Sequence, residues 1–382
     1  MSKIVLAFYN GVFDKSDPNK VPCWYESIVR GLRRKGHSVF LWQIDIFSPE
    51  KTFFSEDEIA SLKEFAPDMC LSFNNVLPDT SVFLSCPVFT IIVDSIMYLS
   101  NTELLDNRQV GCFQYADKKC LVEKYNINEE QVFILPPFSE LKPDASIIQD
   151  VNISFIGTRF GVPRRAEIGF YSSSKDTIRE YCRCIEYIMK NPLVDEKNVL
   201  DSCNVQSEFV RSNIVVSDIL NMLSVEKRVR TLSNLVDLGL ELYGTRSWLA
   251  KYHFDSRLNI AYVDKEVFSI EHNQNIYNRT KIGLNVSHLQ AVDGFPWRVL
   301  DILSSNACLV TDWHDQFKTR FDGLYFPVFR DEHEARDICK HLLDDEDERR
   351  QIVEESNQYV ARNFSIDYFF DEIARITGTK LN

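Results

Sequence analysis

A short stretch of the chain, HLQAVDGFPWRVLDILSSNACLVTD at residues 288–312, holds residue types that can bind a phosphorylated ligand. Two acids, Asp293 and Asp301, lie eight residues apart on either side of Arg298. Pro296 favours the first turn of a helix, whose free N–H groups can hold a phosphate. Arg298 would offer a planar fork of donors to a diphosphate, and Asp301 would accept hydrogen bonds from a ribose diol. The spacing also allows a structural alternative, in which Asp293 and Pro296 only start a helix and Arg298 pairs with Asp301 on its face.

Two turns elsewhere in the second half of the chain follow predicted strands and can bring backbone N–H groups to an anion. Gly157-Thr158-Arg159 is the first turn, and Tyr243-Gly244-Thr245-Arg246, where a nucleotide base would lie, is the second. Arginines near the first turn would neutralise the charge that grows on a leaving diphosphate. The alternative for both turns is ordinary turn geometry with a solvated basic patch. The residues singled out for this ligand are Gly157, Arg159, Arg164, Arg165, Gly244, His288, Gly294, Arg298 and Asp301.

Asp94 is the candidate general base. It follows the apolar run Phe89–Val93, so it would stand at the carboxyl end of a buried strand, where partial desolvation raises the pKa of a carboxyl group and makes it a better base. The alternative is a helix N-cap. Asp293 is the second candidate catalytic residue. An Asp-x-Asp pattern at 345–347 lies in an acidic run and not at a strand end, so we expect neither a metal nor a cofactor.

Composition and charge argue against several other classes. The chain has 382 residues, enough for two domains, and 45% of them are hydrophobic, as in a folded globular protein. Its net charge of −13 argues against a nucleic-acid partner. No apolar run is long enough to cross a membrane, and the ten cysteines are scattered, so we expect reduced thiols in a cytoplasmic protein. A basic run, Arg30, Arg33, Arg34 and Lys35, either complements the end of a helix or contacts an anionic membrane surface.

The first half of the chain alternates short apolar runs with helical patterns. The predicted strands lack the polar alternation of a half-exposed sheet, which is typical of a parallel sheet covered on both faces. Right-handed crossovers then give a Rossmann-like domain over residues 1–140. Its strands are expected at 3–9, 38–43, 69–73, 88–93, 110–113 and 132–135, and its helices at 24–35, 56–64 and 117–125.

A turn-rich segment, 136–149, is expected to link this domain to a second α/β domain over 150–360. A helical insertion covers about 175–238, and a C-terminal helix covers 361–382. We therefore expect an α/β protein with two Rossmann-like domains facing a cleft, in which a ligand binds at the carboxyl ends of the strands. Glycosyltransferases, sugar epimerases and some binding proteins share that architecture. The second-domain strands are expected at 152–156, 240–243, 260–262, 282–286 and 307–311, and a solvated helix junction at 344–350.

The segment from Asn278 to Asp312 resembles the donor-site region of GT-B glycosyltransferases. It is most similar to the "glycosyl transferases group 1" relatives of the CgeB-like type, in which a strand ending in Leu-Asn leads to Gly-x-x-x-Arg-Val and then to a Leu-Val-Thr-Asp strand. Ile153–Gly157, followed by Arg164 and Arg165, is also similar to the first donor-domain strand of that family, so the resemblance covers about residues 151–375. The matching residues are Lys281–Asn285, Gly294, Arg298, Val299 and Leu309–Asp312.

This resemblance implies a glycosyltransferase that moves a sugar from a nucleotide-sugar donor to a glycan or lipid-linked acceptor without a metal, in polysaccharide biosynthesis. The Glu-x7-Glu pattern of many retaining members maps onto Asp293, which would position the sugar, and Asp301, which would grip the ribose. Both acids are one methylene shorter here, and Asn306 replaces the usual glycine of the turn before the last strand. His288 would contact the donor sugar. The alternatives are a nucleotide-sugar epimerase of the same architecture and a non-catalytic nucleotide- or sugar-binding relative.

Overall fold

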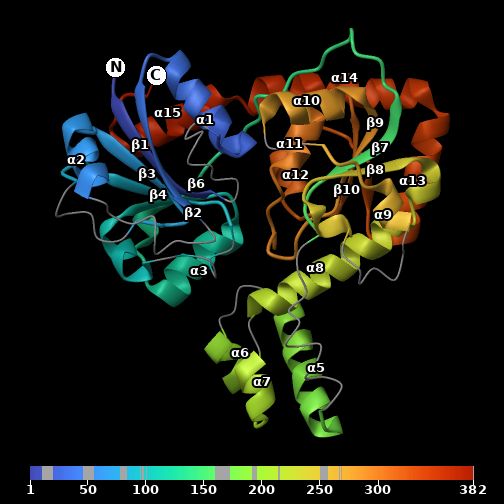
Figure 1. The fold of residues 1–382 in the computed structure, drawn as a ribbon, viewed down its shortest axis with the longest axis horizontal. Helices are drawn as coiled ribbons and strands as arrows, with labels where there is room; N and C mark the ends of the chain where they lie inside the picture. The colour runs from blue at the N-terminus through green and yellow to red at the C-terminus, as the bar shows by residue number, and fades with distance from the viewer. Residues whose placement is uncertain are drawn as a thin grey trace.

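Two α/β domains lie side by side, each built on one parallel sheet, with a helical arm projecting from the second (Figure 1). The predicted fold of two Rossmann-like domains is therefore confirmed. The candidate residues Arg164 and Arg165 lie outside the residues that the structure describes. This computed structural model describes residues 1–10, 20–45, 56–77, 84–94, 96, 99, 101–159, 173–191, 196–213, 216–249, 257–265, 267 and 269–381.

The first sheet has the strand order β2-β1-β3-β4-β5-β6, and its neighbouring strands are all parallel. Its strands are β1 (Lys3–Asn10), β2 (Ser38–Asp45), β3 (Met69–Phe73), β4 (Val88–Ile92), β5 (Gln109–Cys112) and β6 (Val132–Ile134). Its helices are α1 (Cys23–Arg34), α2 (Glu56–Phe65) and α3 (Tyr115–Tyr125), with 3-10 turns η3 (Thr102–Asn107) and η4 (Glu129–Gln131).

The apolar runs of these strands are explained by cover on both faces. Ile4, Leu6 and Phe8 of β1 pack with residues of α1 in one hydrophobic cluster, whereas Val5 and Ala7 belong to a second cluster that contains part of α2. Successive side chains of a strand point to opposite faces, so both faces of this sheet are buried. The loops at the carboxyl ends of the strands are then free to form a binding site.

The second sheet has the order β11-β10-β9-β7-β8, again parallel. The prediction of a strand at 260–262 is wrong, because helix α9 includes most of that segment and Tyr262 makes only an isolated bridge to Leu242. The strands are β7 (Val151–Ile156), β8 (Leu240–Tyr243), β9 (Thr280–Asn285), β10 (Cys308–Asp312) and β11 (Val328–Phe329). The helices are α9 (Arg257–Ala261), α10 (Ile270–Arg279), α11 (Arg298–Leu303), α12 (Phe317–Arg320), α13 (Glu332–Asp344) and α14 (Glu346–Asn363), with 3-10 turns η5 (Val236–Leu238) and η6 (Arg246–Leu249).

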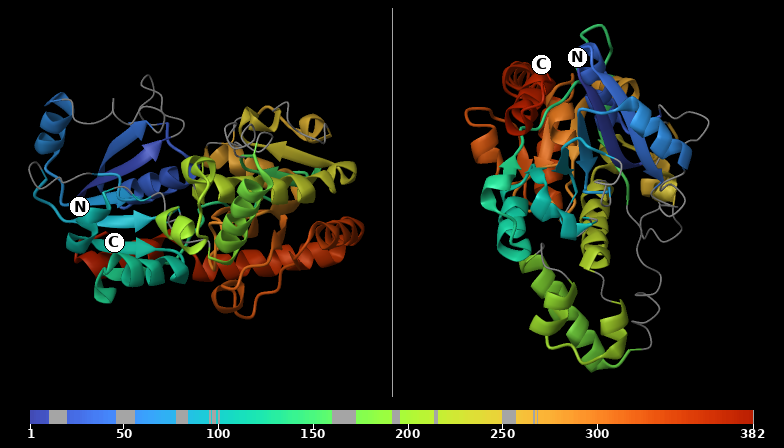
Figure 2. Two further views of the ribbon diagram at one scale, coloured as in Figure 1. Left: turned by 90° about the horizontal axis from the view of Figure 1, so that it is seen from below. Right: turned by 90° about the vertical axis from the view of Figure 1, so that its left-hand side faces the viewer.

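The helical arm consists of α5 (Lys175–Lys190), α6 (Glu196–Ser202) and α7 (Glu208–Asn213), and α8 (Val216–Ser233) runs from it back to the second domain (Figures 1 and 2). The arm has an apolar core of its own, which includes Tyr181, Val210 and Leu220. Leu289, from the loop after β9, packs against this core. The arm and that loop are therefore in contact.

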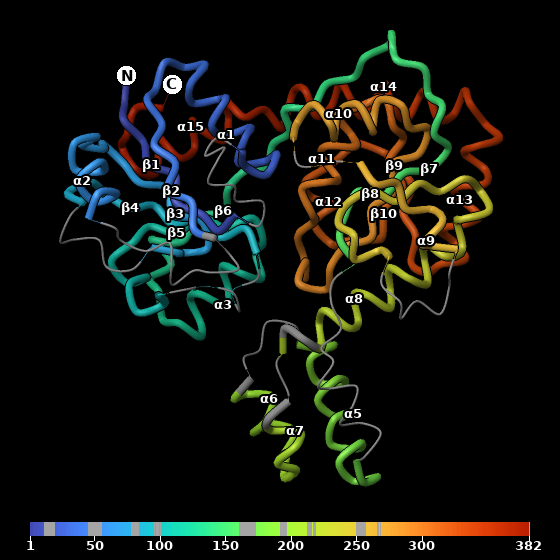
Figure 3. Tube along the Cα trace, in the orientation of Figure 1, coloured from blue at the N-terminus to red at the C-terminus, as the bar shows by residue number. Residues whose placement is uncertain are grey.

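The last helix, α15 (Ile366–Thr377), packs on the first domain although it follows the second domain in sequence (Figure 3). Phe369 and Phe370 are fully buried in the cluster that contains α1 and β1. Both ends of the chain meet there, where the Ser2 hydroxyl donates to the carbonyl of Lys380 at 2.9 Å. The first domain is thus completed by the end of the chain.

Three of the four cations in the basic run of α1 form ion pairs. Arg30 contacts Glu26 and Glu271, Arg34 lies 3.0 Å from Glu140, and Lys35 lies 2.9 Å from Asp367. Most of these acids belong to the linker, to α10 and to α15, so the run ties the first domain to other parts of the chain. A membrane contact through Arg30, Arg33, Arg34 and Lys35 stays a prediction. Within the described ranges, no helix combines the length and the apolar character needed to span a bilayer.

Candidate functional site

A cavity of about 420 Å³ opens between the two sheets. It is lined by residues that follow strands β4 and β5 of the first domain and β9 of the second, as expected for parallel sheets whose carboxyl ends face each other. The predicted position of the ligand cleft therefore contains a cavity. Its lining is Tyr9, Trp24, Tyr25, Ile92, Val93, Asp94, Phe113, Gln114, Asp117, Pro137, Arg228, His288, Gln290, Ala291, Phe295, Pro296 and Trp297.

Aromatic side chains from both domains form one wall of the cavity. The ring of Trp24 in α1 lies 5.8 Å from that of Trp297, and the ring of Phe113 meets Trp297 edge-on at 5.2 Å. Trp297 also packs edge-on against Phe138 at 4.6 Å. Cavities of this kind, apolar with a few polar groups, are typical of small-molecule sites.

Two guanidinium groups lie over one aromatic ring, and of the two only that of Arg228 belongs to a residue that lines the cavity. Arg298 lies 4.7 Å and Arg228 5.4 Å from the centre of the Phe155 ring. Arg228, from α8, is 3% exposed and donates to the carbonyls of Val286 (3.1 Å) and Thr158 (2.5 Å). Burial, and then the charge of Arg298, lowers the pKa of Arg228 well below its ordinary value, and burial lowers that of Arg298. The two cations repel each other, and the charge of the nearby Asp312 acts in the opposite direction on the pKa of both.

A buried network of polar side chains fixes the position of Arg298. Its Nη1 donates to Asn285 Oδ1 at 2.8 Å, and Asn285 Nδ2 donates to Asp312 Oδ1 at 3.1 Å. Asp312 also accepts from Ser287 and pairs with Lys227. Burial alone would raise the pKa of Asp312, but the hydrogen bond of His314 and the charge of Lys227 lower it far below its usual range. A permanently charged carboxylate therefore sets the position of Asn285 and, through it, of Arg298.

Gly157 and Gly244 are required by packing. Gly244 has φ +135°, and a Cβ there would lie 2.3 Å from the carbonyl oxygen of Gly157. A Cβ on Gly157 would lie 2.7 Å from Arg298 Nη2. The N–H of Gly157 is already bonded to the carbonyl of Tyr243 at 2.9 Å, so this group does not point at a phosphate here. Arg159 is buried beside the same turn, and its main-chain N–H donates to Ser247 Oγ at 3.3 Å.

His288 lines the cavity as a neutral side chain. Its Nδ1 accepts from the N–H of Gln290 at 3.1 Å, so Nε2 carries the proton and donates to Asn221 Oδ1 at 2.8 Å. Burial, and then the nearby Arg228 and Lys227, lowers the pKa of His288 to about 4. The ring therefore contributes no charge near neutral pH and anchors the loop to α8.

The acids Asp293 and Asp301 are both used in contacts between parts of the chain, and neither lines the cavity. Asp301, in α11, is 7% exposed and accepts from the hydroxyl of Ser139 in the interdomain linker at 2.8 Å. Arg298 donates to Asn285, so the alternative in which it mainly pairs with Asp301 is not what the structure shows. Burial raises the pKa of Asp301 to about 7. Asp293 Oδ2 accepts from the N–H of Ala116 in the first domain at 3.0 Å.

On the first-domain side, Asp94 follows β4 and faces the cavity. Its Oδ2 accepts from Asn74 Nδ2 at 2.8 Å, and Asn74 Oδ1 accepts from the N–H of Asp94 at 3.2 Å. The side chain is exposed to the cavity space but surrounded by protein, and this burial raises its pKa against the hydrogen bonds of Asn74 and Gln290. Ser95, the next residue, lies outside the described residues, so the N-cap alternative is not tested.

The comparisons with known proteins agree with this geometry. Residues 226–375 match the family model described as "Glycosyl transferase-like". Anabaena HepE in complex with UDP and glucose aligns with a TM-score of 0.51 at 10% identity, covering 98% of this chain and 99% of that one. Sucrose-phosphate synthase from Thermosynechococcus elongatus aligns with a TM-score of 0.54 at 9% identity, covering 98% of each chain. Residues 226–375 are thus similar to glycosyl transferases, and the chain has the GT-B fold.

A third solved structure, an alpha-glucosyltransferase with UDP and a 13-mer DNA, aligns with this GT-B protein at a TM-score of 0.54 and 11% identity, covering 99% of this chain and 100% of that one. A search of curated protein sequences finds no significant match. The predicted GT-B fold is confirmed, and residues 226–375 are similar to the family that the resemblance indicated. Transferase activity and the CgeB-like subtype stay predictions.

Several residues of the GT-B site were not found from the sequence. Arg228 lies in a helix whose pattern indicated only an insertion. Gln114 lies two residues after β5, just as Asp94 lies two residues after β4, and Asp117 lies in the first turn of α3. Asp117 is 2% exposed, burial raises its pKa to about 8, and its Oδ2 accepts from Gln114 Nε2 at 2.9 Å. Asn285 was seen only as part of a motif.

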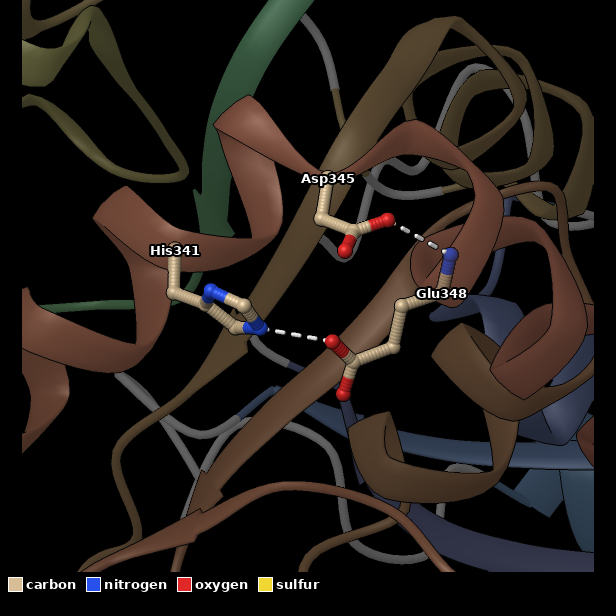
Figure 4. Close-up of side chains that lie close together, drawn as sticks. All are labelled: His341, Asp345 and Glu348. Carbon is tan, nitrogen blue, oxygen red and sulfur yellow. Dashed lines mark hydrogen bonds and ion pairs between the residues drawn. The ribbon is translucent and has the colours of Figure 1, made fainter.

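A separate cluster of His341, Asp345 and Glu348 lies away from the cavity, where α13 meets α14 (Figure 4). Asp345 Oδ1 accepts from the N–H of Glu348 at 2.9 Å and so caps α14, and His341 Nε2 lies 2.6 Å from Glu348 Oε2. These contacts are those of a helix junction, which confirms the solvated junction expected over 344–350.

Proposed function

We propose that the protein transfers a sugar from a nucleotide-sugar donor to a hydroxyl group of a glycan acceptor, either free or carried on a lipid. The observation that carries this proposal is the pair of guanidinium groups, Arg228 and Arg298, which both lie over the ring of Phe155 near the carboxyl ends of β7 and β9. Two enclosed cations that repel each other are stabilised when an anion binds beside them. A diphosphate suits two guanidinium forks well.

The donor would lie on the second domain. Its diphosphate would contact Arg228 and Arg298, with Arg159, Arg164 and Arg165 as further cations near the first turn. Its ribose would be gripped by Asp301 once Ser139 moves away, and its sugar would lie near Asp293, Gly294 and His288. Because the Anabaena structure named above contains UDP and glucose, UDP-sugars are the first donors to test.

The acceptor would lie against the first domain, where Trp24 and Phe113 offer apolar faces to a sugar ring. Asp94 would take the proton of the acceptor hydroxyl while its oxygen attacks the anomeric carbon and the bond to the diphosphate breaks. The charge that grows on the leaving group would be met by Arg228 and Arg298. This is an inverting transfer. Fixed guanidinium charges take the part that a divalent cation plays elsewhere, so we propose that turnover persists in EDTA.

A nucleotide panel tests the donor assignment. UDP, GDP, dTDP and CMP, each alone and as a sugar conjugate, would be added to the protein while its melting temperature is measured. A ligand at about 100 times its Kd stabilises the folded state by about 2.7 kcal/mol, which is a clear shift. We expect one nucleotide class to raise the melting temperature. The assignment fails when none does so at millimolar concentration.

Asp94→Asn tests the base. We expect turnover to fall by about 10²–10⁴-fold while nucleotide affinity stays near that of the wild type, because the acid acts on the acceptor and not on the donor. Turnover would be measured with saturating donor in single-turnover conditions, and affinity by calorimetry. A fully active Asp94→Asn protein would move the base elsewhere or favour a retaining reaction.

The epimerase alternative has one observation in its favour, because a second acid, Asp117, lines the same cavity as Asp94. Epimerisation requires that a proton leaves one face of a sugar carbon and returns to the other face, which two acids can achieve when the sugar lies between them. Incubation of a bound nucleotide-sugar without an acceptor distinguishes the two functions. A transferase gives back the donor or slow hydrolysis products, whereas an epimerase gives an isomer of the donor.

A further inference from the structure

Gln114 of the first domain places its side-chain amide against the donor loop of the second domain, residues 286–297 between β9 and α11. Its Oε1 accepts hydrogen bonds from the N–H groups of Val292 (2.8 Å) and Gly294 (3.3 Å). Its Nε2 donates to the carbonyl of Gln290 at 3.3 Å and to Asp117 Oδ2 at 2.9 Å. One side chain thus bonds three main-chain groups of the facing domain, and Asp117 fixes its orientation.

Gly294 gives Gln114 the room for this approach. A Cβ on Gly294 would lie 2.5 Å from Gln114 Cγ, and the three atoms nearest to it all belong to Gln114. The φ of Gly294 lies outside the left-handed region, so its backbone conformation does not by itself require glycine. Beside it, Asp293 Oδ2 accepts from the N–H of Ala116 in the first turn of α3. The loop is therefore bonded to the first domain at Gln290, Val292, Asp293 and Gly294.

The start of the same loop is tied to its own domain. The N–H of Leu289 donates to Ser224 Oγ at 3.0 Å, and His288 donates to Asn221, both on α8. The donor loop thus runs from an anchor on α8 to an anchor on the first domain. Its second half is also held within the second domain, where the N–H of Gln316 donates to the carbonyl of Asp293 at 3.2 Å and Phe295 packs on Phe317 and Phe321. The bonds of Val292 and Gly294 to Gln114 form only while the two domains are in contact.

We propose that Gln114 is a positioning residue that latches the donor loop when the two domains close on the donor. The proposal rests on the proposed function, because this loop lies in the half of the cavity assigned to the donor sugar. Separation of the domains would break the bonds of Gln114 to Val292 and Gly294 and leave the loop with the contacts that it makes within the second domain. Closure then holds the loop, and the acid Asp293, in one conformation over the donor, as lids do in other enzymes.

Gln114 and Gly294 allow a double-mutant cycle, because Gly294→Ala drives a Cβ into Gln114 Cγ and Gln114→Ala removes that atom. We expect Gly294→Ala alone to lower turnover by about 10–100-fold and the melting temperature by about 2–4 °C. In the Gln114→Ala background the same change should add little to either. The affinity for UDP alone should stay within about 3-fold of the wild type in all variants, since the phosphate-binding side chains are untouched. Small-angle X-ray scattering should show a smaller donor-induced compaction in Gln114→Ala.

The matched control is Gln131→Ala, which removes a glutamine that bonds Asp106 within the first domain and should leave turnover unchanged. Equal losses on Gly294→Ala in both Gln114 backgrounds overturn the latch, and so does full compaction together with wild-type turnover in Gln114→Ala. The melting-temperature cycle reads the contact in the ligand-free protein. This cycle therefore tests the contact between Gln114 and Gly294 even if no nucleotide binds. A failure of all nucleotides to bind would contradict the proposed function and not this contact.

Discussion

At the scale of single residues, Arg228 and Arg298 lie in positions where burial makes a charged side chain unfavourable. Both are enclosed and share the ring of Phe155. Arg228 bonds the carbonyls of Val286 and Thr158, which hold its guanidinium in one orientation before a ligand arrives. Donors that are already oriented lose little entropy on binding and need no reorganisation as charge develops on a leaving group.

Arg228→Ala should therefore weaken nucleotide binding by about 1.5–3 kcal/mol, the range for hydrogen bonds to charged groups. Arg230→Ala is the control, because Arg230 lies two residues along the same helix but is exposed and pairs with Glu226 and Glu332. Calorimetry with the best nucleotide of the panel measures both. Equal affinities of the two variants would remove Arg228 from the site.

Asp117 gives a prediction on pH. Burial raises its pKa to about 8, from an ordinary value of 3.8, so between these limits the folded protein keeps a proton that the unfolded chain loses. Stability due to this group then falls as pH rises from about 4 to 8. Asp117→Asn keeps an acceptor for Gln114 and removes the buried charge, so it should stabilise the protein by about 1–3 kcal/mol at pH 8.5 and much less at pH 4.5. Denaturant unfolding at both values tests this, and parallel pH curves for the two proteins would contradict it.

At the scale of elements, the second-domain side of the site depends on how strand ends and α8 meet. Asn221, Ser224 and Arg228 are spaced three and four residues apart, so they share one face of α8 and all reach the segment just after β9. On the other side, the turns after β7 and β8 approach so closely that Gly244 leaves no room for a side chain. Arg298 lies between these two regions, close to Arg228 of α8 and to the turn at Gly157.

Gly244→Ala should destabilise the protein by more than about 1–3 kcal/mol, which is the usual cost of backbone strain alone. The new Cβ would also lie 2.3 Å from the carbonyl oxygen of Gly157. Gly323→Ala is the control, since Gly323 also has positive φ (+78°) but nothing within 4 Å of its Cβ position. Chemical unfolding of both variants separates the cost of backbone strain, which both share, from the cost of the steric clash, which only Gly244→Ala has. A loss for Gly244→Ala no greater than that for Gly323→Ala would show that the two turns can move apart.

At the scale of the whole molecule, the chain crosses between the domains more than once. The linker carries Ser139 to Asp301, and α15 returns to cover the first sheet beside α1 (Figure 3). The basic end of α1 then pairs with acids of the linker and of α15. The last helix is therefore part of the hydrophobic core of the first domain.

Phe369→Ala should cost about 3–5 kcal/mol, the usual loss for a buried phenylalanine, because its ring is fully buried between Phe138 and Phe370. Tyr368→Ala should change stability by less than about 0.5 kcal/mol, since that side chain is 50% exposed. Urea unfolding measures both. A small loss for Phe369→Ala would mean that α15 is dispensable for the first domain.

The sequence by itself determined the two sheets, most strand positions and the helical arm. Strands that are buried on both faces have continuous apolar sequences. Such a pattern is local, so it can be recognised without knowing which distant residues are in contact. The motif around Arg298 indicated a GT-B glycosyltransferase, and the strand-end rule led to Asp94 at the cavity. In each case the signal lies within a few consecutive residues.

Only the tertiary structure decided which side chains meet across the cavity. Arg228 comes from an insertion helix, Gln114 from the other domain, and Asp312 acts on Arg298 through Asn285. Asp293, which is predicted to position the sugar, accepts a hydrogen bond from the N–H of Ala116 in the first domain, and this contact was not predicted. These pairs are far apart in sequence, and their contact depends on how two separately folded domains are docked, which no local pattern encodes.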